Sequence, residues 1–430
     1  KGVAMQQSIF IQNVHVVDSN TDCVCDLFIQ NGIIQKMGSH LSVQADLVID
    51  GSNLTALPGL FDMHVHLRDP GFTYKEDIIT GAAAALAGGV TGLACMPNTK
   101  PVIDNPEVVQ YILDRAQNTG VKIHPIGCIT RNMQGEALCD YAALKQSGIC
   151  AISDDGKPVE HAGMMLKGLE EAKKHQLPVI SHCEDLSIIN GGIINEGVVS
   201  KKLQVKGMDR TSEDTITARE ILLAQRANSH IHIAHVSTKG SVEIVRIAKQ
   251  HGISVTCETC PHYFLMTEEK VLSRDADYRM SPPLREEEDR IAVLNGVLDG
   301  TIDCIVTDHA PHTPEEKADF EKAPNGVIGM ETSLAATLKL YHEGKLSLKQ
   351  IVSMMADRPR SILNLPQVTI QEQAPAELVL VDLNYKWIVN PEKLHSKAKN
   401  AVFKGVSLKG KPVMTITDGI IRYQDETYPF

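Results

Sequence analysis

Long apolar runs and aromatic residues are scarce in this sequence. Only 4% of its 430 residues are aromatic, and a single one is tryptophan. No apolar segment approaches the ~20 residues that a membrane-spanning helix needs. The N-terminus also lacks the basic and then apolar order of a secretory signal. We therefore expect a cytoplasmic protein without a membrane partner.

Basic residues are outnumbered as well. The chain has 42 Lys and Arg against 53 Asp and Glu, which gives a formal net charge of −11 at pH 7. Nucleic acids and anionic membranes are attracted over long distances by a basic face, and this composition supplies none. The net charge therefore argues against a general role in binding either partner, and an acidic small molecule would have to be held by local positive groups.

Cysteines with the spacing of a structural zinc site are also missing. The ten cysteines are scattered, and Cys257 and Cys260 form a single C-x-x-C without the second pair that a zinc knuckle requires. A chain of this length can fold without disulfides. We expect reduced thiols, with Cys257 and Cys260 buried as ordinary apolar residues.

From residue 57 onward, the sequence alternates short apolar strands with helical stretches. Strand-like segments begin at residue 59 and occur at 91–96, 123–129, 149–153, 179–182, 230–235, 254–259 and 303–307. Repeated β–α units indicate a parallel sheet covered on both faces, and eight strands are the number that closes a (β/α)8 barrel. The predicted fold class is therefore α/β, with a TIM-type barrel over residues 57–373.

Both ends of the chain are rich in β-type segments and carry no recognisable chemistry. The segments lie at 8–17, 25–30, 32–37 and 46–50 before the barrel, and at 377–382, 401–403 and 412–423 after it. Because these ends flank one barrel, residues 1–56 and 374–430 are predicted to pair as one small β-sandwich domain.

Two histidines at the end of the first predicted barrel strand are the first candidates for chemistry. Within the segment Asp62-Met63-His64-Val65-His66-Leu67-Arg68, residues two apart face the same side of an extended strand. His64 and His66 can therefore present both imidazoles to one metal. Taken alone, such a pair is more often two histidines without a ligand.

Three further polar residues follow predicted strands. His182, His235 and Asp308 each stand where a β-type run ends, and barrel enzymes carry their active sites at the carboxyl ends of the strands. The convergence of four histidines and one aspartate predicts a hydrolytic metal site. Nitrogen and oxygen ligands of this kind suit zinc best, although cobalt or manganese would also fit.

A series of short motifs resembles the dihydroorotases of the amidohydrolase superfamily. In order within residues 57–329 they are His64-x-His66-x-Arg68, Pro97-Asn98-Thr99-Lys100-Pro101, Ser181-His182-Cys183-Glu184-Asp185, His235-Val236-Ser237-Thr238, Ser281-Pro282-Pro283-Leu284-Arg285 and Asp308-His309-Ala310-Pro311-His312. The resemblance implies reversible cyclisation of N-carbamoyl-L-aspartate to L-dihydroorotate in pyrimidine (UMP) biosynthesis. It also implies two zinc ions per subunit. One is held by His64, His66 and Asp308, and the other by His182 and His235.

The residue that bridges the two metals separates the branches of this superfamily. Hydantoinases, allantoinases and the animal-type dihydroorotases use a carbamylated lysine at the end of a middle strand. Here residues 149–156 contain no lysine and include Asp154 and Asp155, which resembles the bacterial dihydroorotases that place an aspartate there. Spacing to His182 favours Asp155 as the ligand, although either aspartate could instead cap a turn.

The resemblance also implies roles around the metals. Asp308 would act as a general base and then as a general acid. Arg68 faces the same side as His66 and could hold the substrate carboxylate in a paired contact, unless it forms a surface salt bridge. The other predicted substrate-binding residues are Asn98, Ser281, His312, Asn325 and Gly326. Ser281 and Asn325 depart from the family pattern, in which many bacterial members have asparagine and an aromatic residue there.

Some of these histidines and amides have plainer interpretations. Asn98 could be a turn residue, and His312 could be a buried histidine with ordinary hydrogen-bond partners. We expect His232, His262 and His309 to be structural or to orient the metal ligands.

Two other functions stay open. Residues 257–262 look more like hydantoinases and allantoinases, but the missing lysine and the presence of Arg68 argue against that branch. The second is a non-catalytic dihydroorotase-like partner of aspartate transcarbamoylase, which should have lost its metal ligands. A homodimer and association with aspartate transcarbamoylase are both compatible with the resemblance, and the charged loop 274–290 could close over substrate.

Overall fold

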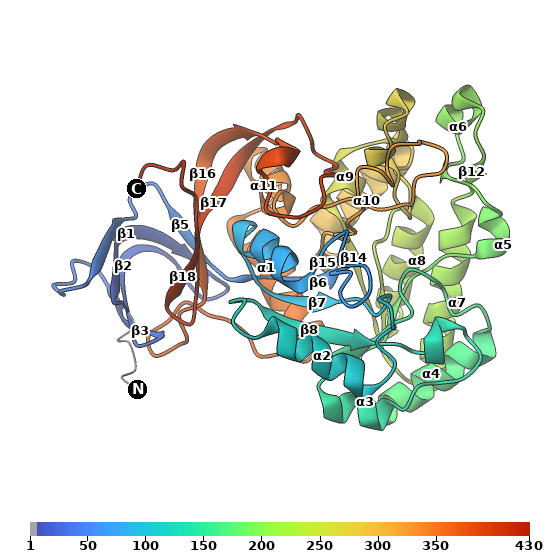
Figure 1. The fold of residues 1–430 in the computed structure, drawn as a ribbon, viewed down its shortest axis with the longest axis horizontal. Coiled ribbons are helices and arrows are strands. Elements are labelled where there is room, and N and C mark those ends of the chain that lie inside the picture. The colour runs from blue at the N-terminus through green and yellow to red at the C-terminus, as the bar shows by residue number, and fades with distance from the viewer. Residues whose placement is uncertain (1–6) are drawn as a thin grey trace.

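The computed structural model describes residues 7–430 and shows a barrel with a small sheet beside it (Figure 1). The small sheet lies at one end of the molecule, on the left in Figure 1. The predicted lack of a secretory signal falls partly on residues 1–6, which lie outside the described residues. None of the described helices is long and apolar enough to cross a membrane.

Eight parallel strands form the barrel. They are β6 (Leu60–Val65), β7 (Val90–Cys95), β8 (Lys122–Gly127), β9 (Ala151–Ile152), β10 (Ile180–Ser181), β13 (Ile231–Ile233), β14 (Val255–Thr259) and β15 (Cys304–Ile305). Pairing runs through β6-β7-β8-β9 and through β10-β13-β14-β15. Parallel bridges join these halves, between Ile152 and Val179 and between Val65 and His309. The ring is therefore closed, and the predicted (β/α)8 barrel is confirmed.

Helices cover the barrel on the outside. Strands β6 and β7 are buried at every position, as expected of strands that are covered on both faces. The main helices are α1 (Ile78–Ala87), α2 (Pro106–Ala116), α3 (Tyr141–Ser147), α4 (Ala162–Lys174), α7 (Thr211–Ala227), α8 (Lys239–Gln250), α10 (Glu287–Asp299) and α11 (Ser333–His342). Shorter helices are α9 (Pro261–Leu265), α12 (Leu348–Val352) and α13 (Arg358–Ile362).

An insertion between β10 and α7 extends the mouth of the barrel. It contains α5 (Leu186–Ile189), β11 (Ile194–Asn195), α6 (Val198–Leu203) and β12 (Gly207–Met208). Short 3-10 helices occur at Arg131–Met133, Glu268–Ser273, Ala276–Tyr278 and Pro391–Lys393, and the π-helical stretch Ser353–Asp357 connects α12 with α13.

Both ends of the chain build one eight-stranded sheet. It contains β1 (Ile9–Val17), β2 (Asp22–Gln30), β3 (Ile33–Gly38), β4 (Leu47–Asp50), β5 (Thr55–Pro58), β16 (Leu378–Ile388), β17 (Ser407–Thr417) and β18 (Ile420–Gln424). The two ends meet where β5 pairs with β16. Because side chains alternate along a strand, Leu378 and Leu380 enter the core of the sheet while Val379 and Val381 enter the core of the barrel. Strand β16 thereby fixes the sheet against the barrel.

Some details of the flanking segments differ from the prediction. Residues 401–403 form no strand, and Ala401 makes only an isolated bridge with Ile328 in a barrel loop. The predicted strand there was wrong because this segment packs on the barrel instead of pairing in the sheet. The run 412–423 is the hairpin of β17 and β18, which turns at Asp418 and Gly419 with φ of 50° and 71°. Strand β5 extends to Pro58, two residues past the predicted boundary at 56.

Candidate metal centre

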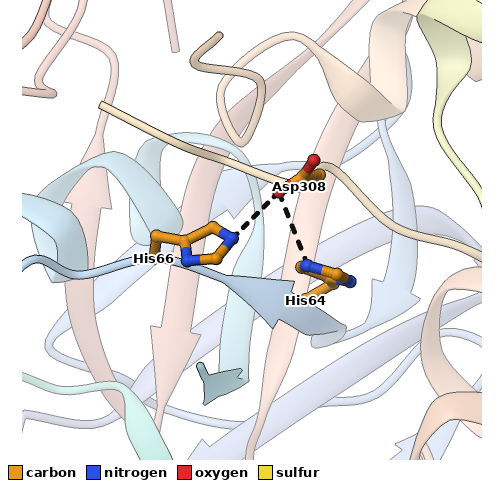
Figure 2. A group of neighbouring side chains, drawn as sticks. All are labelled: His64, His66 and Asp308. Carbon is orange, nitrogen blue, oxygen red and sulfur yellow. Dashed lines mark hydrogen bonds and ion pairs between the residues drawn. The ribbon is translucent and has the colours of Figure 1, made fainter. Parts of the chain in front are cut away.

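His64 and His66 lie at the mouth of the barrel, where β6 ends. Oδ1 of Asp308 lies 3.5 Å from Nε2 of His64 and 3.0 Å from Nε2 of His66 (Figure 2). Asp308 follows β15, and the bridge between β6 and the segment after β15 brings these strand ends together. Two imidazole nitrogens and one carboxylate oxygen therefore converge on one point.

Asp155 presents a different oxygen to each pair of histidines. Its Oδ2 lies 3.4 Å from Nε2 of His64 and 3.3 Å from Nε2 of His66. Its Oδ1 lies 3.5 Å from Nδ1 of His182 and 3.5 Å from Nε2 of His235. The Asp155 carboxylate therefore lies between the two histidine pairs and offers one oxygen to each.

Asp154 points elsewhere, although it precedes Asp155 directly. Its carboxylate accepts hydrogen bonds from the N–H groups of Ile129 and Thr130 and from the Thr130 hydroxyl. These contacts make Asp154 a brace for the loop after β8.

The donor atoms of this cluster fit a metal site. Nε2 of His64 and Oδ1 of Asp155 are buried without a hydrogen-bond partner among the described residues. Buried polar atoms left unpaired destabilise a fold by about 1–3 kcal/mol each, and a cation held among these ligands would satisfy both. His64 with His66 and Asp308, and His64 with Asp155 and His235, bring ligand atoms within 4.8 Å of one another.

Three predicted site residues other than glycine adopt backbone conformations with positive φ. The angles are 62° at Arg68, 32° at His235 and 47° at Asp308. Residues other than glycine seldom adopt such conformations, and those that do cluster at functional sites. At these positions the turn after each strand directs the side chain into the barrel mouth.

Two of the histidines are oriented by partners behind them. Nδ1 of His64 lies 2.5 Å from Oε1 of Glu258, whose Oε2 lies 3.1 Å from Nε2 of His232. Burial would raise the pKa of Glu258, but the charge of His64 and the hydrogen bonds with His232 and His64 lower it to about 2. Nδ1 of His66 lies 2.8 Å from Oδ1 of Asn98. Both imidazoles therefore keep Nε2 toward the centre.

A buried arginine stands next to these ligands. Nε of Arg68 donates to the carbonyl oxygen of Pro311 at 3.2 Å, and its Nη2 lies 3.3 Å from Nε2 of His312. Burial lowers the pKa of Arg68 to about 10, so the guanidinium is charged at neutral pH. Burial and the charges of Arg68 and Lys75 lower the pKa of His312 to about 2, so this imidazole is neutral.

Two of the predicted substrate-binding residues, Asn325 and Gly326, lie next to His312. The carbonyl oxygen of Asn325 lies 2.9 Å from Nε2 of His312, whereas the Asn325 side chain accepts a hydrogen bond from Arg279. The Asn325 side chain is thus engaged away from His312, and the backbone of Asn325 and Gly326 faces it.

The chain resembles known proteins along nearly its whole length. The model of the dihydro-orotase-like family matches residues 54–241. The dihydroorotase of Pelobacter propionicus is 46% identical over 422 residues, which cover 97% of this chain and 100% of the relative. The dihydroorotase of Geotalea daltonii is 48% identical over 417 residues, 96% of this chain and 98% of the relative. The chain belongs to the dihydroorotase family.

Solved structures show the same architecture. An L-hydantoinase from Arthrobacter aurescens matches with a TM-score of 0.86 at 23% identity, over 96% of each chain. A dihydropyrimidinase from Brevibacillus agri matches with a TM-score of 0.82 at 22% identity, over 96% of this chain and 94% of the other. At these identities the likeness concerns the fold alone, and it confirms the barrel with a small β domain.

Within this dihydroorotase-family chain, Ser281 contacts a carboxylate that the sequence did not single out. Its hydroxyl donates to Oε1 of Glu184 at 2.7 Å, and Oε2 of Glu184 lies 3.2 Å from Nε2 of His182. Ser281 therefore reaches a metal-site histidine through Glu184. Glu184 could have been predicted from the sequence, because it stands two residues after His182 in one of the motifs that carry the family resemblance.

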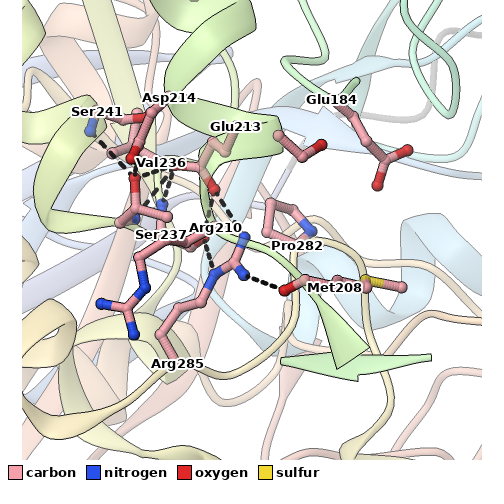
Figure 3. Close-up of polar contacts among 12 residues, drawn as sticks. Glu184, Met208, Arg210, Glu213, Asp214, Val236, Ser237, Ser241, Pro282 and Arg285 are labelled. Carbon is pink, nitrogen blue, oxygen red and sulfur yellow. Dashed lines mark hydrogen bonds and ion pairs between the residues drawn. The ribbon is translucent and has the colours of Figure 1, made fainter. Parts of the chain in front are cut away.

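The loop 274–290 is anchored at its far end. The guanidinium of Arg285 contacts Ser237, Asn195 and the carbonyl of Met208, and it pairs with Glu213 at 3.5 Å (Figure 3). Tyr263 Oη also donates to the carbonyl oxygen of Pro282 at 2.6 Å. These contacts tie the loop to the turn that follows His235, to strands β11 and β12 of the insertion and to α9.

The remaining predicted histidines lie around the site without joining the ligand cluster. His232 bonds Glu258 and Thr256, and His309 lies 3.4 Å from Glu76. His262 is buried, and burial lowers its pKa to about 4. All ten cysteines are free, including the buried Cys257 and Cys260, which agrees with the predicted thiols.

Proposed function

We propose that this protein is a dihydroorotase, which interconverts L-dihydroorotate and N-carbamoyl-L-aspartate. The observation that carries the proposal is the buried Arg68 beside the metal-site cluster. Dihydroorotate bears a carboxylate that plain cyclic amides such as hydantoin lack. A guanidinium binds a carboxylate through two parallel hydrogen bonds, so Arg68 favours the acidic substrate over the uncharged ring.

As part of this proposal, six residues hold two zinc ions: His64, His66, Asp155, His182, His235 and Asp308. The two unpaired buried atoms and the position of Asp155 between the histidine pairs support this assignment. Zinc bound there would polarise a substrate carbonyl and lower the pKa of water.

Asp308 is the residue we assign to proton transfer. Its side chain is 12% exposed, whereas that of Asp155 is 2% exposed, so substrate and water can reach Asp308 more readily. Burial would raise the pKa of Asp308, but the charge of His64 and the hydrogen bond with His66 lower it. The carboxylate is therefore ionised and can accept a proton from the attacking water. It returns this proton to the ring nitrogen as the C–N bond breaks, and ring closure reverses these steps.

The substrate is oriented by the residues beside the cluster. Arg68 binds the carboxylate next to the neutral His312, and the backbone of Asn325 and Gly326 contacts the ring amide. Asn98 and Ser281 act through His66 and through Glu184, the residues that they contact in the structure.

The test is turnover of dihydroorotate and carbamoyl-aspartate by the purified zinc-loaded protein, beside allantoin, hydantoin and dihydrouracil. We expect turnover of the two acidic substrates, lost in Asp308→Ala. In Arg68→Lys we expect kcat/KM for dihydroorotate to fall about 10- to 150-fold, because hydrogen bonds to charged groups contribute about 1.5–3 kcal/mol. Turnover of uncharged rings alone would favour a hydantoinase or allantoinase. Bound zinc without any turnover would favour a non-catalytic partner of aspartate transcarbamoylase.

We further propose a place in pyrimidine biosynthesis in the cytoplasm. The net charge of −11 supports a small-molecule substrate over nucleic acid. A homodimer and association with aspartate transcarbamoylase are tested by light scattering of the protein alone and mixed with that enzyme.

A further inference from the structure

The C-terminal segment 396–404 leaves the small sheet and reaches the mouth of the barrel. None of the site residues predicted from the sequence lies in this segment. It contacts four places there. Ser396 and Lys397 bind Glu76, Lys404 pairs with Asp275 and Asp277, and Asn400 binds the turns at 310–312 and 326. The segment therefore connects the small sheet with the loops around the site.

Asn400 makes the contacts with the turns at 310–312 and 326. It is 3% exposed, and both polar atoms of its side chain are engaged. Oδ1 accepts a hydrogen bond from the N–H of His312 at 3.3 Å. Nδ2 donates to the carbonyl oxygens of Ala310 at 3.3 Å and Gly326 at 3.0 Å. The Asn400 carbonyl oxygen also accepts from the N–H of Ile328 at 3.0 Å.

These bonds join the two turns that lie beside Arg68 and His312. Asn400 contacts Ala310 and His312, the two neighbours of Pro311 in the chain. The carbonyl oxygen of Pro311 accepts a hydrogen bond from Arg68. The contact to Gly326 fixes the turn whose Asn325 carbonyl faces His312. The turns are so close that a Cβ at position 326 would lie 2.7 Å from the Ala310 carbonyl oxygen. One amide thus bridges both turns, in addition to the backbone bond from the N–H of Ala310 to the carbonyl oxygen of Val327.

We infer that Asn400 is a positioning residue for the substrate, acting through His312 and the turn at Asn325 and Gly326. The inference rests on the proposed function, since it concerns the same proposed substrate-binding residues. Asparagine suits this place because it is neutral and combines an acceptor with two N–H donors. Aspartate would keep the acceptor for His312 and lose the donors to the two carbonyls.

The test compares Asn400→Ser and Asn400→Asp with the control Asn390→Ser, all zinc-loaded. Asn390 is exposed in the same C-terminal part and only accepts from the N–H of Glu392. We expect faster amide hydrogen exchange in peptides covering 310–328 for both Asn400 variants. We also expect KM for dihydroorotate to rise about tenfold, with kcat and zinc content close to those of the unmodified protein. The control should change neither exchange nor KM.

Unchanged exchange in 310–328, or faster exchange with an unchanged KM, would overturn the inference. Loss of zinc together with kcat would also overturn it, because Asn400 would then support the whole fold. If Asn400→Ser does not fold, Asn400→Asp still tests the two donor bonds. If the unmodified protein hydrolyses another cyclic amide and not dihydroorotate, the proposed function fails. The exchange data and KM for that amide then decide the role of Asn400 separately.

Discussion

Nδ1 of His64 lies 2.5 Å from Oε1 of Glu258, and both side chains are fully buried. Because Glu258 is ionised, Nδ1 carries the proton and Nε2 faces Asp155 and Asp308. This contact fixes both the tautomer and the ring orientation of His64. It also places a negative charge behind a proposed ligand, which makes the imidazole a better donor to a cation.

Glu258→Ala should therefore weaken metal binding without removing a ligand. Replacement of such an orienting carboxylate typically lowers metal affinity about 10- to 100-fold, and we expect a loss in that range. Competition with a chelator measures the affinity. Glu269→Ala is the matched control, since Glu269 is exposed. Equal affinities in the two variants would refute the orienting role.

Asp154 and Asp155 allow a comparison between neighbours of the same type. The Asp155→Asn variant should bind fewer than two zinc ions per subunit, because the substitution removes the carboxylate between the histidine pairs. Asp154→Asn should keep its zinc and lose thermal stability, since its hydrogen bonds hold the loop at Ile129 and Thr130. Zinc content by mass spectrometry and melting temperature separate these outcomes. Zinc loss in Asp154→Asn alone would reverse our assignment.

Metal binding should depend on pH in a defined direction. In the metal-free protein, burial lowers the pKa of His182, but hydrogen bonds with Asp155 and Glu184 raise it to about 10. At pH 7 this imidazole is then protonated and cannot bind a cation, so zinc must displace a proton. The apparent affinity should rise as pH increases from 6 toward 10. Calorimetric titration in buffers of different ionisation enthalpy counts the released protons, and an affinity that is constant with pH would contradict the prediction.

The positions of five of the six proposed ligands could be predicted from the sequence because they depend on local rules. Side-chain alternation places His64 and His66 on one face, and the barrel places its active site at the ends of strands. These rules hold even for β10 and β15, which are two residues long. The predicted strand ends therefore gathered the four histidines and Asp308, whereas Asp155 came from the family resemblance, with Asp154 left open as the alternative.

The residues that support the ligands could not be predicted in the same way. Glu258 is 194 residues from His64, Ser281 is 97 residues from Glu184, and Asn400 is 88 residues from His312. These contacts form only when the barrel closes and the C-terminal segment folds back on it. No periodicity in the sequence indicates these contacts.

Arg285 and Glu213 provide a test of the loop beside the site. Both are almost fully buried and pair at 3.5 Å, while Glu213 also binds the N–H groups of Ser237 and Thr238. Removing one partner of a buried ion pair typically destabilises a protein by about 3–5 kcal/mol, because the other charge stays buried. Arg285→Met should therefore lower the free energy of unfolding by about that amount, seen as a lower midpoint in urea. Arg226→Met is the control, since Arg226 is exposed and surface changes typically stay within about 0.5 kcal/mol. Adding Glu213→Gln to Arg285→Met should restore part of the loss, because no unpaired charge remains. An Arg285→Met midpoint equal to that of the control would show that the loop is held by other contacts.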